Sequence, residues 1–159
     1  MPVTPFHFGP GLLLKSAAPR HVSFTAFAAT QVAVDVEPLY HILRHEYPVH
    51  RVLHTVWAAG AMGLAVGLAV WAGARDRTRR LDSRAREDLE RNAAIVGGLL
   101  GGITHPLLDG LMHRDMRPLW PFAQTTWVVG PDGVVALHVG CILAGALGAA
   151  VLWLRRGRP

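Results

Sequence analysis

The sequence has little charge and almost no cysteine. Only 17% of its 159 residues are charged, and Cys141 is the single cysteine. One cysteine excludes an intrachain disulfide and leaves no set of thiolates for a structural zinc site. Cys141 lies in an apolar stretch rich in glycine and alanine, which favours a role as a small packing residue. The chain is instead rich in hydrophobic residues, at 51%, which is more than a typical soluble domain has.

Three long apolar runs dominate the chain. They cover residues 52–74, 93–112 and 134–154. A run of about 20 residues matches the roughly 30 Å hydrocarbon core of a bilayer. We therefore predict an all-α integral membrane protein, a helical bundle with three transmembrane helices in a single domain over residues 1–159. A soluble helical bundle is the alternative, but so short a chain has too little polar surface to cover three such helices.

Residues 1–36 are expected to form a short helical hairpin packed against the bundle. Its two apolar stretches are separated by Pro19 and Arg20, and at about 11 and 15 residues they are too short to cross a bilayer comfortably. No basic region precedes an apolar stretch at the N-terminus, so a cleavable signal is not expected. Glu37 and Pro38 are expected to end the second short helix and to be followed by a polar connector over residues 39–49.

Arginine is concentrated in the linker over residues 75–92 and in residues 155–158. Because basic residues that flank transmembrane helices mark the cytoplasmic side, we expect the linker to be cytoplasmic. Membrane topology thereby explains the net charge of +5. No stacking aromatic residues are interleaved with the arginines, so no nucleic-acid partner is expected. Within the linker, the spacing of Arg84 and Asp88 indicates a solvated, ion-paired helix.

Ionisable residues collect where the apolar runs begin and end. Two pairs with four-residue spacing lie there: His50 with His54, and His105 with Asp109. This spacing puts both members of a pair on one face of a helix. A lone histidine on an apolar face is more often structural, but two spaced pairs favour a metal site. The expected ligands, which would meet at the extracytoplasmic end of the bundle, are His7, Asp35, His50, His54, His105 and Asp109.

Imidazoles and carboxylates suit a divalent ion, zinc first, with manganese or iron as alternatives. Six candidate ligands exceed the needs of one tetrahedral ion, so either two ions bind or some of the six orient the others. A catalytic ion lowers the pKa of bound water toward about 7. Glu37 is the candidate general base, and an acidic cap beside Pro38 is the alternative reading.

Arginines on the same side of the bundle could bind an anionic oxygen of a substrate. Arg51 and Arg117 are the candidates, because a planar guanidinium matches phosphate well. Interfacial charge is a competing explanation for Arg117. His113 follows Asp109 by four residues and is either a further ligand or a surface histidine.

The order of these motifs resembles the YdjM-like family of membrane-bound metal-dependent hydrolases, over about residues 4–122. The motifs are an early His7, Asp35 closing a hairpin, His50-Arg51-x-x-His54-Thr55, His105-x-x-x-Asp109 and Pro118-Leu119-Trp120-Pro121-Phe122. The resemblance implies an integral protein of the bacterial inner membrane with metal roles for the six ligands above. It also implies a distant similarity to zinc-dependent phospholipase C and nuclease folds. The chain departs from the family's Pro-Asp-x-Asp segment, where it has Val34-Asp35-Val36-Glu37.

We therefore expect a membrane-bound hydrolase that uses metal-activated water on an ester or a phosphoester. The expected partners are membrane lipids and a small or lipid-like anionic substrate. A small metal or proton transporter and a regulatory membrane protein with a structural metal are the alternatives. A transporter needs polar groups along a path through the bilayer, and residues 93–100 offer none, which favours the hydrolase.

Overall fold

The computed structural model describes residues 4–75 and 82–156, and across these two stretches the regular structure is helical, with no strand. The α-helices are α1 (Phe8–Ala17), α2 (Phe24–Val34), α3 (Val36–Leu43), α4 (Val56–Ala74), α5 (Ser83–Asp88), α6 (Arg91–Asp109) and α7 (Pro131–Arg156). Two short 3₁₀-helices, η1 (Thr4–His7) and η2 (Val52–His54), precede α1 and α4. The all-α class predicted from the sequence is confirmed.

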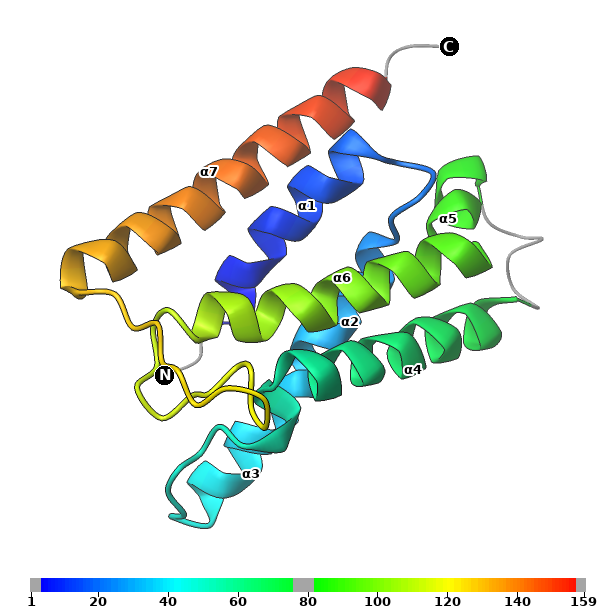
Figure 1. Cartoon of the computed structure of the whole chain (residues 1–159). Coiled ribbons are helices and arrows are strands. Elements are labelled where there is room, and N and C mark those ends of the chain that lie inside the picture. Colours follow the sequence, from blue (N-terminus) through cyan, green and yellow to red (C-terminus); the bar gives the residue numbers. More distant parts are fainter. Residues whose placement is uncertain (1–3, 76–81, 157–159) are drawn as a thin grey trace.

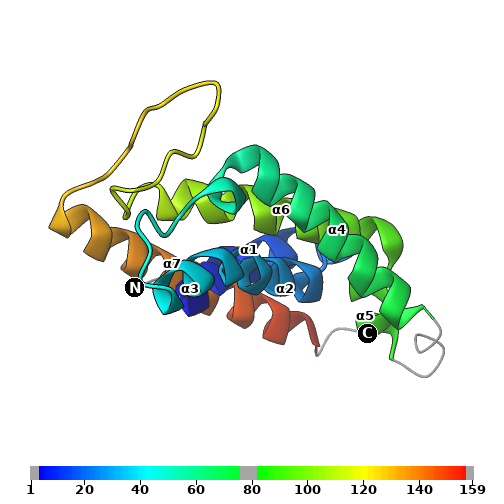
Figure 2. The same cartoon turned by 90° about the horizontal axis from the view of Figure 1, so that it is seen from below.

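Helix α6 lies at the centre of the bundle. It packs against α4 and α2, and α1 packs against α7 (Figures 1 and 2). Glycines allow the close approach of α6 to its neighbours. A Cβ added at Gly98 would collide with the carbonyl oxygen of Gly63 on α4, and one at Gly97 would collide with the carbonyl oxygen of Ser23. Backbones thus touch directly, as small residues permit between helices in membranes.

Two helices are long and apolar enough to span a membrane, α4 and the Pro131–Arg155 part of α7. The expectation of three spans is not met within the described residues, because α6 is not among them. Its sequence combines glycines with polar residues such as Asn92, His105 and Asp109, which lowers its hydropathy. Helix α6 packs against α2 and α4, and its buried polar end carries candidate ligands.

The connector expected over residues 39–49 is partly wrong, because residues 36–43 form α3. Pro38 lies in the first turn of this helix, where an amide hydrogen would have no partner within the helix in any case. Proline therefore starts a helix here. Asp35 is the residue between α2 and α3, and its backbone is close to helical, with φ −69° and ψ −8°.

The shared helical face predicted for His50 and His54 is also wrong. Thr55 caps α4 by accepting a hydrogen bond from the Ala58 amide at 3.3 Å, so the helix begins only at Val56. His50 lies in an irregular segment and His54 in η2. The prediction is confirmed for His105 and Asp109, which both lie in the last turns of α6.

Asp88 of the linker does not behave as a solvated residue paired with Arg84. Its carboxylate accepts hydrogen bonds from Lys15 Nζ at 2.8 Å and from the Phe24 amide at 2.9 Å. Burial raises the pKa of Asp88, but the hydrogen bonds from Lys15, Thr25 and Phe24 outweigh burial and hold it below its ordinary value. Asp88 thereby joins α5 to the start of α2. The linker arginines Arg77, Arg79 and Arg80, and Arg158 of the tail, lie outside the described residues.

Candidate metal centre

The ends of separate elements converge at one end of the bundle, opposite α5 (Figure 1). The end of η1 supplies His7, the junction of α2 and α3 supplies Asp35, and η2 supplies His54. The last turns of α6 supply His105 and Asp109. Three of these side chains are almost completely buried: His54 at 1% exposure, and His105 and Asp109 at 0%. Ionisable groups this deep are costly unless they are paired or coordinate an ion.

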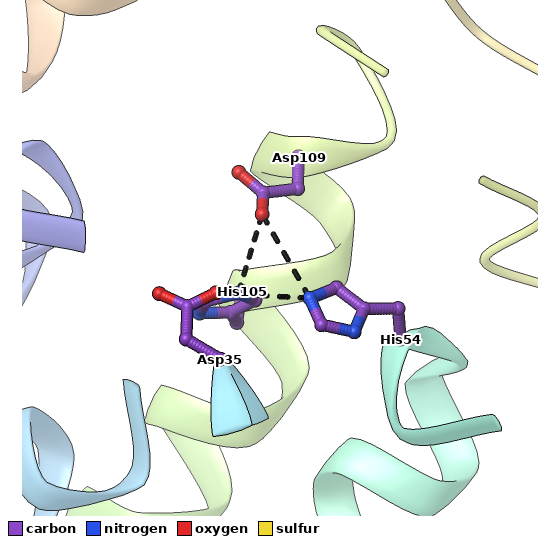
Figure 3. A group of neighbouring side chains, drawn as sticks. All are labelled: Asp35, His54, His105 and Asp109. Carbon is purple, nitrogen blue, oxygen red and sulfur yellow. Dashed lines mark ion pairs between the residues drawn. The ribbon is translucent and has the colours of Figure 1, made fainter. Parts of the chain in front are cut away.

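Four side chains form the core of the cluster (Figure 3). His105 Nε2 lies 3.2 Å from Asp35 Oδ1 and 3.3 Å from Asp109 Oδ2. His54 Nε2 lies 3.8 Å from Asp35 Oδ1 and 4.0 Å from Asp109 Oδ2. One ligand atom of each residue lies within 4.8 Å of the others. Two imidazoles and two carboxylates around one point are a donor set that suits zinc.

A second group adjoins the first and shares one residue with it. His50, Asp109 and His113 also offer ligand atoms within 4.8 Å of one another. The ring centroids of His50 and His113 are 4.5 Å apart, and those of His50 and His54 are 4.7 Å apart. The structure thus places His113, which the sequence left open, beside the expected ligands.

His7 approaches the cluster on the other oxygen of Asp109. Its Nε2 lies 3.1 Å from Asp109 Oδ1, and its ring makes an edge contact with that of His105 at 4.9 Å between centroids. Only 2% of His7 is exposed. All six ligands expected from the sequence therefore lie at this end, five of them around Asp109.

Three of the histidines are held by their Nδ1 atoms. His54 Nδ1 lies 3.1 Å from Glu37 Oε2, and His50 Nδ1 lies 3.0 Å from Asp115 Oδ1. His105 Nδ1 is 2.5 Å from Gln31 Oε1. A ligand histidine characteristically donates its second ring nitrogen in this way, which fixes both its tautomer and its orientation.

The opposite nitrogens of the same three rings have no hydrogen-bond partner among the described residues. The buried atoms in question are His50 Nε2, His54 Nε2 and His105 Nε2. Buried polar atoms nearly always have a partner, so three such atoms beside two carboxylates are unusual. A cation placed between them would satisfy all of these atoms. The residues present therefore fit a divalent ion.

Burial keeps the imidazoles of the second group neutral. Desolvation and the neighbouring His54 hold the pKa of His50 below its ordinary value. Desolvation does the same for the pKa of His113. A metal ligand has to be the neutral imidazole, so both rings are in the form that binds an ion near neutral pH.

Glu37 lies behind His54. Its carboxylate accepts hydrogen bonds from the Arg51 amide at 2.9 Å and the Leu53 amide at 2.9 Å, in addition to its contact with His54. Burial raises the pKa of Glu37, but the hydrogen bonds from His54 and these amides outweigh burial and hold it below its ordinary value. Both oxygens are engaged, so the geometry favours Glu37 as a positioning residue for His54.

Arg51 lies outside the cluster, with an exposed side chain. Its Nε donates to the Pro48 carbonyl at 2.9 Å, and one of its terminal nitrogens donates to Glu46 Oε2 at 3.1 Å. This position is compatible with contact to a substrate and not with contact to an ion in the cluster.

Sequence analysis missed Gln31 and Asp115. Gln31 is fully buried in a helix without charged residues and lies one turn before Asp35, and this position in the sequence could have indicated its role. Asp115 lies in the loop after α6 and contacts a residue 65 positions away. No spacing in the sequence indicates such a contact.

The chain was compared with models of known families, with curated proteins and with solved structures, and none of the three comparisons finds a match. The resemblance to the YdjM-like family stays a prediction from the residues.

Proposed function

We propose that this protein is a membrane-bound metal-dependent hydrolase that acts on an ester or phosphoester. The observation that carries the proposal is the arrangement of His50, His54 and His105. Each ring is fixed through Nδ1 by a carboxylate or amide oxygen, and each buried Nε2 lacks a hydrogen-bond partner within the described part of the chain. Such preorganisation around an ion is typical of a metal centre.

The donor set assigns residues to up to two ions, with zinc as the first choice and manganese or iron as alternatives. Asp35, His54, His105 and Asp109 would hold one ion. His50, Asp109 and His113 would hold a second, with the Asp109 carboxylate shared. His7 would complete either set. An ion bound there supplies a Lewis acid and makes water a competent nucleophile near neutral pH.

A hydrolase fits this site better than a transporter or a structural centre. The ligands collect at one end of the bundle, and α4, with a mean hydropathy of 1.6, adds no polar side chains to a path through the bilayer. A structural zinc site needs four ligands, commonly thiolates. Here more than four imidazoles and carboxylates lie together, which favours a catalytic centre over a structural one.

The membrane part of the proposal rests on α7. Only 11% of its most apolar window is buried, whereas a core helix of a soluble protein is mostly buried. Its exposed side includes Val139, Ile142, Leu143 and Leu147, at 48–63% exposure. We further propose the bacterial inner membrane, with the metal centre extracytoplasmic. Lys15, Arg75 and Arg84 lie at the opposite end, which the positive-inside rule would assign to the cytoplasm.

The proposal is tested by quantifying metal in the full chain purified in detergent and by assaying chromogenic phosphodiesters and esters. We expect bound zinc and hydrolysis, with both lost in His105→Ala. The matched control is His21→Ala, an exposed histidine outside the cluster. Metal retained without any hydrolysis would indicate a structural centre. Metal-driven flux in vesicles without hydrolysis would indicate a transporter.

A further inference from the structure

A cleft of about 530 Å³ adjoins the metal centre. One wall is the segment that leads into α4, and the other is the loop that follows α6. His50 and Asp115 line the cleft. His50 belongs to the second ligand group, and Asp115 fixes its orientation by contacting Nδ1 of the ring. A molecule in the cleft therefore lies beside the metal centre.

The cleft is positively charged. Arg51, Arg114 and Arg117 line it, and Asp115 is the acidic residue among its lining. Both oxygens of Asp115 are engaged, because its carboxylate contacts His50 Nδ1 at 3.0 Å and accepts from the Val49 amide at 3.1 Å. The lining thus has more guanidinium groups than carboxylates to pair with them.

Two of the three guanidinium groups are available to a ligand. Arg114 is exposed, and among the described residues it has no acidic partner. Arg117 donates to Gln124 Oε1 at 2.7 Å, which is a neutral acceptor that an anion can replace. Arg51 is paired with Glu46 at 3.1 Å. Guanidinium groups match phosphate oxygens in geometry and in charge.

The rim of the cleft is apolar. Tyr47 is 77% exposed, Val52 56% and Trp120 44%, and all three line the cleft. Phe122, at 79% exposure, extends this apolar surface and packs edge-on against Trp57 at 5.4 Å between centroids. Trp57 belongs to α4, one of the two helices able to span a membrane. The cleft therefore joins basic groups to an aromatic edge, as interfacial sites do.

We infer that this cleft holds the phosphate group of the substrate, and that the enzyme acts on a phosphoester with an apolar substituent and not on a neutral ester. The inference rests on the proposed hydrolase function. In the reaction a water oxygen forms a bond to phosphorus and the bond from phosphorus to the alcohol oxygen breaks. One proton of the water passes to the departing alcohol, and the other stays on the phosphate product or is released to solvent. Arg114 and Arg117 bind the phosphate oxygens, and Tyr47 and Trp120 contact the apolar substituent.

The experiment measures phosphate binding separately from hydrolysis. The full chain in detergent is treated with a chelator, and binding of glycerol 3-phosphate is measured by calorimetry. A second arm measures binding to phosphatidylcholine vesicles with and without phosphatidate. Arg114→Gln and Arg117→Gln are each expected to weaken phosphate binding by roughly tenfold to a hundredfold, the range for hydrogen bonds to charged groups. Arg20→Gln is the control, because Arg20 is exposed at the other end of the bundle.

The arms separate the sources of the phosphate. Much tighter binding to phosphatidate vesicles than to glycerol 3-phosphate supports a phosphoester with an apolar substituent, such as a lipid. Similar affinity for the two keeps the phosphate site and overturns the contact with an apolar substituent. Either result supports phosphate binding in the cleft, provided that Arg114→Gln and Arg117→Gln weaken this binding. No phosphate binding, or an equal loss in Arg20→Gln, overturns the inference.

Failure of the inference and failure of the proposed function give different results. Hydrolysis of neutral esters that is insensitive to Arg114→Gln and Arg117→Gln leaves the hydrolase standing and removes the phosphate site. Arginine-dependent phosphate binding without retained metal or hydrolysis leaves the cleft as a phosphate site and removes the hydrolase.

Discussion

Glu37 holds His54 from behind, with Oε2 of the carboxylate 3.1 Å from Nδ1 of the ring. The other ring nitrogen of His54 faces the carboxylates of the cluster. The imidazole is thus fixed on one side and left to bind an ion on the other. Glu37 would thereby act on the ion through His54.

Glu37→Gln tests this role. We expect metal affinity to fall by roughly tenfold to a hundredfold, the usual cost of losing a partner that orients a ligand. Competition with a chromophoric chelator measures the affinity. Glu46→Gln is the control, because Glu46 contacts His41, Arg44 and Arg51. If Glu37 is instead the general base, the variant keeps its metal affinity and loses only its hydrolytic rate.

Asp109 belongs to both ligand groups. Asp109→Asn is therefore expected to abolish binding of both ions, because an amide is a much poorer ligand than a carboxylate. His113→Ala is expected to remove one ion and keep the other. Elemental analysis of the purified variants gives the ratio of metal to protein. Equal losses in the two variants would contradict a centre with two sets of ligands.

Metal affinity is expected to fall as the pH is lowered from about 8 to about 6, because ligand histidines must be neutral. Desolvation lowers the pKa of His54, but the nearby carboxylates of Asp35 and Glu37 outweigh this and raise it above its ordinary value in the metal-free protein. Protons therefore compete with the ion at His54. Metal titrations at a series of pH values measure the effect, and an affinity independent of pH would contradict it.

Asp88→Asn is expected to lower the free energy of unfolding by roughly 2 kcal/mol near neutral pH, because Lys15 loses a charged acceptor. The folded pKa of Asp88 is depressed, so its stabilisation is present above the unfolded pKa of about 4 and disappears as the pH falls through the folded value. Denaturant unfolding in detergent should thus show the variant and the parent converging in acid. A constant difference at all pH values would exclude the ionised carboxylate as the cause.

Gly98→Ala is expected to destabilise the bundle by roughly 1–3 kcal/mol, because the new methyl group meets the carbonyl oxygen of Gly63. Gly140→Ala is the matched control, since nothing lies within 4 Å of a Cβ added at Gly140. The control should be neutral or more stable, as alanine favours a helix. Thermal unfolding followed by circular dichroism compares the two. Equal stabilities would show that α4 and α6 separate easily.

The sequence predicted the metal cluster better than it predicted the local structure. The spacing of His105 and Asp109 works because α6 is a regular helix as far as Asp109. His50 and His54 reach the same cluster although they share no helical face, because the chain enters the site irregularly before α4 begins at Val56. For that pair, the boundary between polar and apolar sequence was informative and the spacing was not.

Other features depend on contacts between distant parts of the chain. Asp115 lies 65 positions from His50, and Asp88 lies 64 positions from Phe24. Each of these carboxylates has a plausible local role in sequence, as a loop residue or as part of a helical ion pair. In the folded chain both carboxylates instead contact distant segments, and no periodic pattern in the sequence indicates these contacts.

The contact between His7 and Asp109 joins the first described helix to the last turns of α6. The candidate donors come from separate segments between His7 and His113, so a fragment that ends before α6 lacks His105, Asp109 and His113. Ion uptake would therefore come late, after α6 has docked between α2 and α4. A nascent chain could therefore bind the proposed ion only after α6 and the loop that follows it have been synthesised, so that metal binding would be coupled to folding.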